Sequence, residues 1–392
     1  MPYAFTLGYQ IPTEVTFGPG VVSRIGELVK QYSKKVLLVT MKDIPSLPRV
    51  IKLLEEAGCD IILFDEVAPN PVDSTINSTA LIAKENGCKV IVGLGGGSSI
   101  DTAKATAVLA THPGNAWDYT VEMGRDKRPV TSSVLPVIAI PTTAGTGAEV
   151  TKNAILTNPK AKQKSPIQSI HICPKHALVD PELTITMPAG VTAATGFDAF
   201  THAFERYLCE ESFPFIEHMA EEAMRTVVRN LEKVLSKPDD MEARAAMSWA
   251  STQAGFTLLA TNMGESGLHV FSLPVSAHFD VSHGEALAVV MPFVLEELSK
   301  IRPKKTAKLA SILSREKDTG VGRNEKEACA FTQQAMERWF SAIHLKRRLS
   351  DYGIQERDLG KIAASINRDR LTNAWKKEFT FEEVRAYYAR CL

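Results

Sequence analysis

The sequence lacks the features that would assign it to several large classes of protein. Its six cysteines are scattered and form no Cys-x-x-Cys pair, so neither a disulfide framework nor a thiolate metal site is indicated. Basic and acidic residues balance at 45 each and no basic block stands out, which argues against a nucleic-acid partner. The sequence contains no run of about 18 uninterrupted apolar residues, so we expect no membrane span. The N-terminus has no positive start before an apolar run, so we expect no signal peptide and a cytoplasmic protein.

What the chain does contain is enough apolar material for two hydrophobic cores, with 392 residues of which 44% are hydrophobic. The first part alternates between two patterns. Short apolar runs predict strands at 35–40, 60–66, 89–97 and 134–143, and helical patterns between them lie at 48–58, 74–87 and 100–110. This alternation is typical of right-handed βαβ units and of a parallel sheet covered by helices on both faces.

From about residue 184 the strand-like runs almost vanish. Helices are predicted at 189–209, 213–236, 240–262, 285–300, over long stretches of 303–364, and at 381–390. We expect Pro274 to break or kink a helix between His269 and His283.

The change of pattern predicts two domains, with a boundary near Pro181–Pro188. Residues 1–183 are expected to form an α/β domain and residues 184–392 a helical domain. The cleft between two such domains is the expected ligand site.

A glycine-rich turn, GLGGGSSID, follows the predicted strand at 89–97. Gly95, Gly96 and Gly97 would let backbone N–H groups approach phosphate oxygens, and Ser98 opens the next helix with its hydroxyl and the helix dipole. Small residues at a tight strand-to-helix turn also have a purely structural explanation.

A second polar loop favours the phosphate-binding explanation over the purely structural one. PTTAGTGAEVT at 141–151 also follows a predicted strand and carries Thr142, Thr143 and Thr146. Two strands of one parallel sheet deliver their loops to the same carboxyl edge, which is where open α/β sheets bind ligands. The two loops together favour a nucleotide cofactor.

Four residues of the second half suit a metal ion. Asp198 and His202 are four residues apart in a predicted helix and therefore project from one face. His269 and His283 follow, and one carboxylate with three imidazoles suits a first-row divalent ion with room for a substrate oxygen. Such an ion would act as a Lewis acid while a nicotinamide carries the hydride. Taken singly, a capping Asp and packed core histidines are the alternative.

These motifs resemble those of the iron-dependent (group III) alcohol dehydrogenases nearly end to end. The shared motifs are FGPG, PNP (69–71), GGGSSID, PTTAGTGAEVT, VDPELT (179–184), GFDAFTHAFE and SHGEALAVVMP. The resemblance implies a Rossmann-like α/β N-terminal domain and an all-α C-terminal domain, the dehydroquinate synthase-like fold. It also implies an NAD(P)-dependent enzyme that interconverts primary alcohols and aldehydes by hydride transfer with Fe²⁺. Zn²⁺ stays possible because His and Asp donors serve both ions. We expect a homodimer.

The resemblance also assigns roles to individual positions. It implies metal ligands at Asp198, His202, His269 and His283. It implies dinucleotide contacts at Gly95, Gly96, Gly97, Ser98, Asp101, Thr142, Thr143 and Thr146. It places Val179 near the adenine, Lys164 near cofactor and metal, and Asn153 in the substrate pocket.

Two positions depart from the family pattern. Leu273 stands four residues after the third ligand, where many relatives have a histidine near the nicotinamide, so we expect a more apolar substrate pocket. Met41 stands where NAD-preferring relatives often place an Asp that binds the ribose. Lys42 could bind a 2′-phosphate, which slightly favours NADP, whereas Asp43 could replace the missing carboxylate.

Three alternatives remain at this stage. Maleylacetate reductases share the fold but lack the metal ligands. A glycerol dehydrogenase-like or dehydroquinate synthase-like enzyme pairs NAD with a metal, but the latter needs a basic site, whereas SGLHVFSLPVSAHF is mostly apolar. A non-catalytic nucleotide- or metal-binding protein would bind both ligands and turn over no aldehyde.

Overall fold

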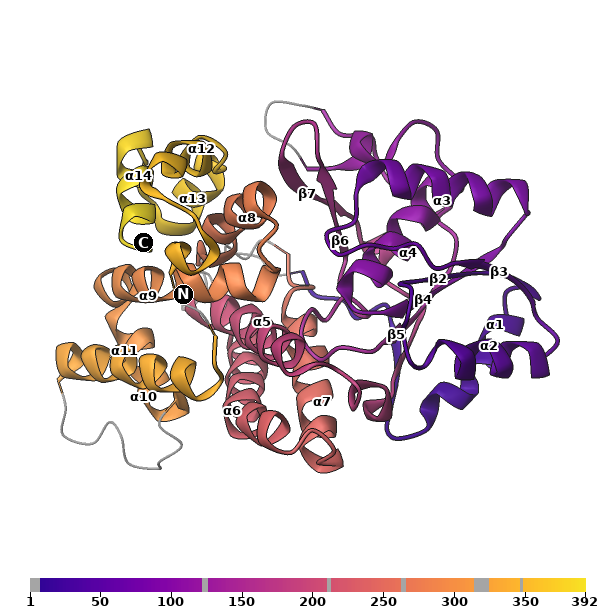
Figure 1. Cartoon of the computed structure of the whole chain (residues 1–392), viewed down its shortest axis with the longest axis horizontal. Helices are drawn as coiled ribbons and strands as arrows, with labels where there is room; N and C mark the ends of the chain where they lie inside the picture. Colours follow the sequence, from indigo (N-terminus) through magenta and orange to yellow (C-terminus); the bar gives the residue numbers. More distant parts are fainter. Residues whose placement is uncertain (1–7, 122–125, 210–212, 262–265, 314–323, 346–347) are drawn as a thin grey trace. The chain divides into compact units, whose positions relative to one another are not determined.

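The computed structural model describes residues 8–121, 126–209, 213–261, 266–313, 324–345 and 348–392. They form two compact units, which are described separately (Figure 1). The α/β unit comprises Gln10–Met187, and the helical unit comprises Pro188–Leu392 together with Gly8 and Tyr9.

The α/β unit is built on a six-stranded sheet in which every pair of neighbouring strands is parallel. The strands in spatial order are β1 (Glu14–Phe17), β8 (His176–Val179), β5 (Val137–Pro141), β4 (Val90–Gly95), β2 (Lys35–Thr40) and β3 (Asp60–Phe64). The predicted parallel sheet is confirmed. The strand expected at 35–40 has its predicted bounds, and the strands expected at 60–66, 89–97 and 134–143 are confirmed but shorter. The four-residue edge strand β1 and its neighbour β8 were not predicted.

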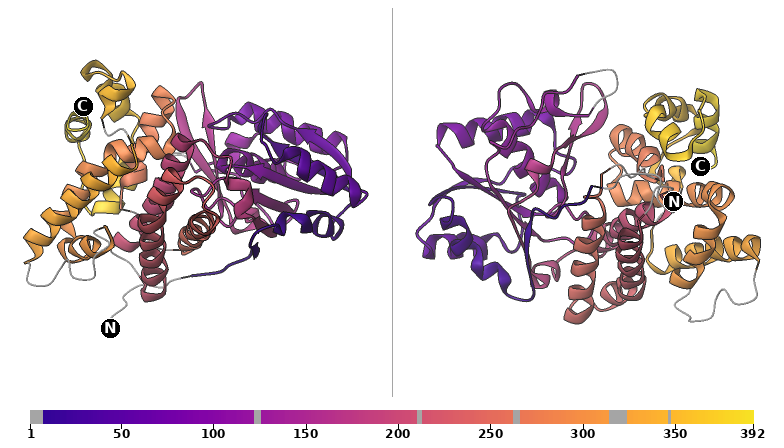
Figure 2. Two further views of the ribbon diagram at one scale, coloured as in Figure 1. Left: turned by 60° about the horizontal axis from the view of Figure 1, so that its bottom comes forward. Right: turned by 180° about the vertical axis from the view of Figure 1, so that it is seen from behind.

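Helices cover both faces of this sheet (Figures 1 and 2). They are α1 (Ile25–Lys30), α2 (Leu47–Glu56), α3 (Asp73–Glu85) and α4 (Gly97–Leu109), with 3₁₀ turns η1 (Val21–Arg24), η2 (Ala116–Tyr119), η3 (Ile170–Ile172) and η4 (Pro181–Thr184). Alternate residues of β2 serve the two faces, because side chains alternate along a strand. Leu38 packs with α1 and α2, whereas Leu37 packs with α4.

An antiparallel hairpin of β6 (Asn153–Asn158) and β7 (Gln163–Gln168) completes the unit. The sequence did not indicate it, since Pro166 lies within β7 and a proline argues against a strand unless that strand lies at an edge.

The helical unit contains the helices α5 (Ala189–Leu208), α6 (Pro214–Ser236), α7 (Met241–Thr257), α8 (Leu268–Phe279), α9 (His283–Ile301), α10 (Pro303–Leu313), α11 (Glu325–Ala342), α12 (Leu359–Ala364), α13 (Arg368–Trp375) and α14 (Phe381–Ala389), with 3₁₀ turns η5 (Leu349–Tyr352) and η6 (Glu356–Asp358). Apart from one isolated bridge between Gly8 and Thr261, its described residues form helices and their connections, as predicted. Within the described ranges, no helix combines the length and apolarity needed to cross a membrane.

A break or kink was expected at Pro274, and the break is wrong. Helix α8 continues through Pro274 to Phe279, and the chain leaves it only at Asp280, which has a left-handed φ of 52°. An internal proline costs about 3 kcal/mol or more, but α8 buries Leu268, Val270, Phe271 and Val275, whose transfer from water offsets that cost.

Candidate active-site residues

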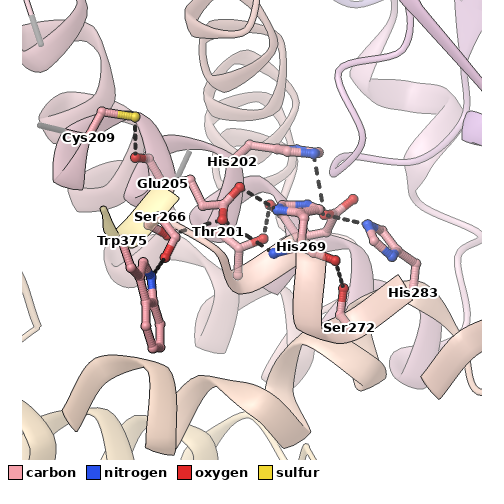
Figure 3. A network of polar contacts seen from close by, with 10 residues as sticks. Thr201, His202, Glu205, Cys209, Ser266, His269, Ser272, His283 and Trp375 are labelled. Atoms are coloured by element: carbon pink, nitrogen blue, oxygen red, sulfur yellow. Dashed lines mark hydrogen bonds and ion pairs between the residues drawn. The ribbon is translucent and has the colours of Figure 1, made fainter. Parts of the chain in front are cut away.

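Three imidazoles converge on one carboxylate oxygen in the helical unit. The Oδ1 atom of Asp198 lies 3.6 Å from His202 Nε2, 3.7 Å from His269 Nε2 and 3.8 Å from His283 Nε2. The rings of His202 and His269 are stacked with their centroids 4.9 Å apart. Figure 3 shows the three histidines turned toward one another from α5, α8 and α9.

Local sequence explains how the four residues are positioned. Asp198 and His202 share one face of α5, as their spacing predicted. His283 is the first residue of α9, and the next residue, Gly284, lies against α5 so closely that a Cβ there would be 2.0 Å from the carbonyl oxygen of Ala194. Glycine at 284 therefore lets the start of α9 approach α5 and brings His283 to Asp198.

The electrostatics of this cluster suit a cation. Burial raises the pKa of Asp198, but the nearby imidazoles of His202, His269 and His283 outweigh that effect and hold this pKa well below its usual range. Asp198 is 3% exposed, and neither its Oδ1 nor His269 Nε2 has a hydrogen-bond partner within the described part of the chain. Buried polar atoms are normally hydrogen-bonded, so these two atoms call for another partner.

The donor set and its spacing fit a divalent first-row ion. The ligand atoms of Asp198, His269 and His283 all lie within 4.8 Å of one another. His202 approaches the same Oδ1 atom but is outside that mutually close group. Ligands of a tetrahedral ion with bonds of about 2.1 Å are roughly 3.4 Å apart, which is close to the observed 3.6–3.8 Å. Imidazole and carboxylate donors serve both Fe²⁺ and Zn²⁺.

Glu205, one turn after His202 on α5, was not singled out from the sequence. Its carboxylate lies 2.7 Å from His269 Nδ1. Burial lowers the pKa of His269, but the carboxylates of Glu205 and Asp198 together outweigh that effect and raise this pKa to about 10. The signal was its place in GFDAFTHAFE, seven residues after Asp198 and so on nearly the same helix face.

In the α/β unit, the two predicted phosphate-binding loops meet. Strands β4 and β5 pair with Gly95 opposite Pro141, and Thr142 N donates to Gly95 O at 2.9 Å. A Cβ at Gly97 would lie 2.7 Å from Thr146 Cγ2, so the glycine turn and the threonine loop are in direct contact. The expectation that both loops reach one edge of the sheet is confirmed.

The meeting loops present a partly exposed polar surface. Gly96, Gly97, Ser98, Thr143 and Thr146 are half-buried, whereas the flanking strands are buried. Helix α4 begins at Gly97, and its N-cap Gly96 supplies no side-chain cap to the first turn. Free backbone N–H groups at a helix start and hydroxyls beside them are what a dinucleotide pyrophosphate requires.

The remaining predicted cofactor and pocket residues have the following positions. Asp101 Oδ2 accepts from Ile155 N at 3.0 Å, and burial raises the pKa of Asp101 to about 6. Lys164 Nζ donates to Asn70 Oδ1 at 2.7 Å, and Asn153 Oδ1 accepts from Gln168 Nε2 at 3.0 Å. Val179 is buried at the end of β8. After β2, Met41 is half-buried and Lys42 is exposed. Leu273 is half-buried on α8, one turn after His269.

Lys104 is a second residue that sequence reasoning missed. It is fully buried on α4, and its Nζ donates to Ala148 O at 3.1 Å, to Thr151 Oγ1 at 3.2 Å and to Asn153 O. Lys104 therefore ties the helix of the glycine turn to the end of the threonine loop and to the start of β6. Its pattern, a lysine inside an apolar helix, was visible in IDTAKATAVLA.

Comparison with known proteins identifies the family of this chain. The family model for the iron-containing alcohol dehydrogenases matches residues 12–181, and the model for the C-terminal part of the Fe-containing alcohol dehydrogenase family matches residues 192–392. A 1,3-propanediol dehydrogenase of Citrobacter freundii is 33% identical over 368 residues, which cover 92% of either chain. The NAD-dependent methanol dehydrogenase of Bacillus methanolicus is 33% identical over 379 residues, covering 95% of this chain and 97% of that one.

One solved structure has a similar fold over the whole length of this chain. An archaeal halo-thermophilic alcohol dehydrogenase from a Red Sea brine pool has a TM-score of 0.93 to this chain at 29% identity, with 100% of both chains covered. The chain therefore belongs to the iron-containing alcohol dehydrogenase family and is an NAD(P)-dependent oxidoreductase that interconverts primary alcohols and aldehydes by hydride transfer.

Proposed function

We propose that Asp198, His202, His269 and His283 hold the iron of this dehydrogenase. The observation that carries the proposal is the approach of three Nε2 atoms to one buried carboxylate oxygen at 3.6, 3.7 and 3.8 Å. When bound, such an ion supplies Lewis-acid chemistry to a substrate oxygen, and the nicotinamide supplies the hydride chemistry. The chain's own contribution is a set of donors brought together by α5, α8 and α9. Zn²⁺ is the alternative ion for the same donors.

We propose that the two meeting loops bind the dinucleotide. Gly95, Gly96, Gly97 and Ser98 would offer backbone N–H groups to the pyrophosphate, with the hydroxyls of Thr142, Thr143 and Thr146 beside them. Asp101 is proposed as a further dinucleotide contact. Lys104 ties α4 to the threonine loop through a buried hydrogen bond to Ala148 O. Lys164 and Val179 are proposed as further cofactor contacts.

We also propose a slight preference for NADP(H). Met41 offers no carboxylate to the ribose, and Lys42 is exposed at the end of β2, where it could bind a 2′-phosphate. For the substrate we propose a small primary alcohol or aldehyde with an apolar tail. Asn153 of the α/β unit and Leu273 of the helical unit are each proposed as substrate contacts. Relatives named for 1,3-propanediol and methanol support a short primary alcohol.

Further proposals concern the setting of the enzyme. We propose a cytoplasmic homodimer with no membrane partner. Its balanced charge supports the further proposal that it has no nucleic-acid partner. We retain residues 1–183 and 184–392 as the proposed functional domains, one for the cofactor and one for the metal.

The test is removal of single ligands. His269→Ala and His283→Ala, each loaded with Fe²⁺ under anaerobic conditions, should lose most of their bound iron, and kcat/KM for an aldehyde panel with NADPH and NADH should fall by more than about 100-fold. That size is expected because losing only an outer partner of a ligand costs about 10–100-fold. The exposed His218 on α6, whose Nδ1 contacts Pro214 O, provides the control variant His218→Ala. Near-normal turnover by metal-free His283→Ala would overturn the proposed site.

A further inference from the structure

Glu205 is a buried carboxylate that the proposed function does not use. It lies on α5, one turn after His202, and is only 5% exposed. Burying a carboxylate is costly unless its oxygens are paired and hydrogen-bonded. Both oxygens of Glu205 are hydrogen-bonded, and two of the three donors belong to His269.

The hydrogen bonds of Glu205 determine how His269 can be protonated. Oε2 lies 2.7 Å from His269 Nδ1, and Oε1 accepts from His269 N at 3.3 Å and from Ser266 Oγ at 3.0 Å. An ionised carboxylate only accepts, so the Nδ1 atom facing it must carry a proton. In the neutral ring this leaves Nε2 with its lone pair, and Nε2 is the atom 3.7 Å from Asp198 Oδ1.

A second layer holds Glu205 in place. Ser266 is fully buried, its hydroxyl donates to Glu205, and its carbonyl oxygen accepts from Trp375 Nε1 at the end of α13. Figure 3 shows Trp375, Ser266, Glu205 and His269 following one another in this order. The start of α8 is thereby tied to α5 and α13.

We propose that Glu205 is a positioning residue for the metal centre, which keeps the proton of His269 on Nδ1 and turns Nε2 toward Asp198. The inference rests on the proposed metal site and adds a residue to it. Outer carboxylates that orient a ligating histidine typically contribute about 10–100-fold in metal affinity.

Glu205→Gln is the sharpest substitution because it preserves shape and removes one acceptor. A glutamine has one carbonyl oxygen and one NH₂ group. If the NH₂ group replaces Oε2, two N–H donors face each other, and the tautomer with its proton on Nε2 becomes favoured. A protonated Nε2 has no lone pair to offer the metal. If it replaces Oε1, it opposes the backbone N–H of His269. Either orientation disturbs the ring.

The experiment measures affinity for Co²⁺ alone, by visible absorption in competition with a chelator, for the full-length metal-free chain. We expect Glu205→Gln to weaken Co²⁺ binding by about 10–100-fold. In a His269→Ala background the same substitution should change affinity by less than about threefold, since a residue that acts through His269 has nothing left to position. Glu217→Gln is the matched control, because Glu217 lies in the same unit and pairs with Lys305 at 2.7 Å.

Each outcome decides the question. A loss below about threefold for Glu205→Gln, or an equal loss with and without His269, overturns the positioning role. If Glu205→Gln fails to fold, as judged by circular dichroism of the metal-free chain, Ser266→Ala replaces it: it deletes one donor to Oε1, and unchanged Co²⁺ affinity would overturn the inference. A wild-type chain that binds no Co²⁺, or binds it as well after His283→Ala, instead refutes the metal site itself.

Discussion

At the scale of single residues, the side chain beside each ligand tunes what the site accepts. Leu273 follows His269 by one helical turn on α8 and is half-buried. Residues four apart lie on the same helix face, so Leu273 shares the side of α8 that carries the ligand. A leucine there cannot hydrogen-bond a hydroxyl group of a substrate.

We therefore expect the wild-type enzyme to favour aldehydes with apolar tails. One buried methylene contributes roughly 0.8 kcal/mol, so kcat/KM should rise several-fold or more from acetaldehyde to butanal. Leu273→His should weaken this trend and improve glycolaldehyde and lactaldehyde, whose hydroxyl then has a partner. Steady-state kinetics of both proteins decide the matter, with unchanged iron content as the control. A wild-type preference for hydroxyaldehydes, or equal ratios in both proteins, would show that position 273 does not face the substrate.

Cofactor choice is a second property of single residues. Met41→Asp should move preference toward NADH by placing a carboxylate where it accepts from a ribose diol and repels a 2′-phosphate. Lys42→Ala should weaken the binding of NADPH and leave the binding of NADH unchanged, because only NADPH carries the 2′-phosphate. The ratio of kcat/KM for NADPH and NADH measures both effects. A wild-type preference for NADH of tenfold, about 1.4 kcal/mol, would contradict the role assigned to this loop.

At the scale of elements, the metal centre depends on how closely α9 approaches α5. Gly284 is where this approach is tightest, because a Cβ there would meet the backbone of Ala194 at 2.0 Å. Backbone atoms cannot turn away as a flexible side chain can, so the helices would have to separate.

We expect Gly284→Ala to destabilise the chain by about 1–3 kcal/mol, the usual cost of overpacking, and to weaken Fe²⁺ binding by displacing His283. Urea unfolding and iron titration check the two effects. Gly360→Ala in α12 is the matched control, since a Cβ there would meet nothing within 4 Å. Equal behaviour of the two variants would mean that this contact does not position α9.

At the scale of the whole molecule, the two ligands should stabilise different units. The proposed iron ligands all lie on α5, α8 and α9 of the helical unit, whereas the nucleotide loops adjoin β4, α4 and β5 of the α/β unit. A ligand that binds only the folded state adds about 2.7 kcal/mol at 100 times its Kd.

Hydrogen exchange should therefore separate the two effects. Fe²⁺ should slow exchange in α5, α8 and α9, and NADPH should slow it around 95–99 and 141–146. Removing iron with a chelator should reverse only the first change. If Fe²⁺ protected both units equally, or protected neither, the prediction that iron stabilises only the helical unit would be wrong.

Many strands and helices could be predicted from the sequence because each depends on the residues within it. The strands at 35–40 and 60–64 are β-branched apolar runs, and the helices at 189–208 and 214–236 repeat apolar residues at helical spacing, so each could be predicted from its own residues. The hairpin β6–β7 and the edge strand β1 could not, because a strand containing Pro166 and a strand of four residues become regular only through their partners.

The sequence by itself determined that Asp198 and His202 share a helix face and that a glycine turn and a threonine loop each follow a strand. Both facts depend on neighbours in the chain, and helical and strand periodicity express them directly. Only the tertiary structure decided that His269 and His283 reach the same carboxylate oxygen, that Glu205 faces Nδ1 of His269, and that α8 survives Pro274. These depend on side chains from separate helices packing together, and the free energy of burial that joins them belongs to no single segment.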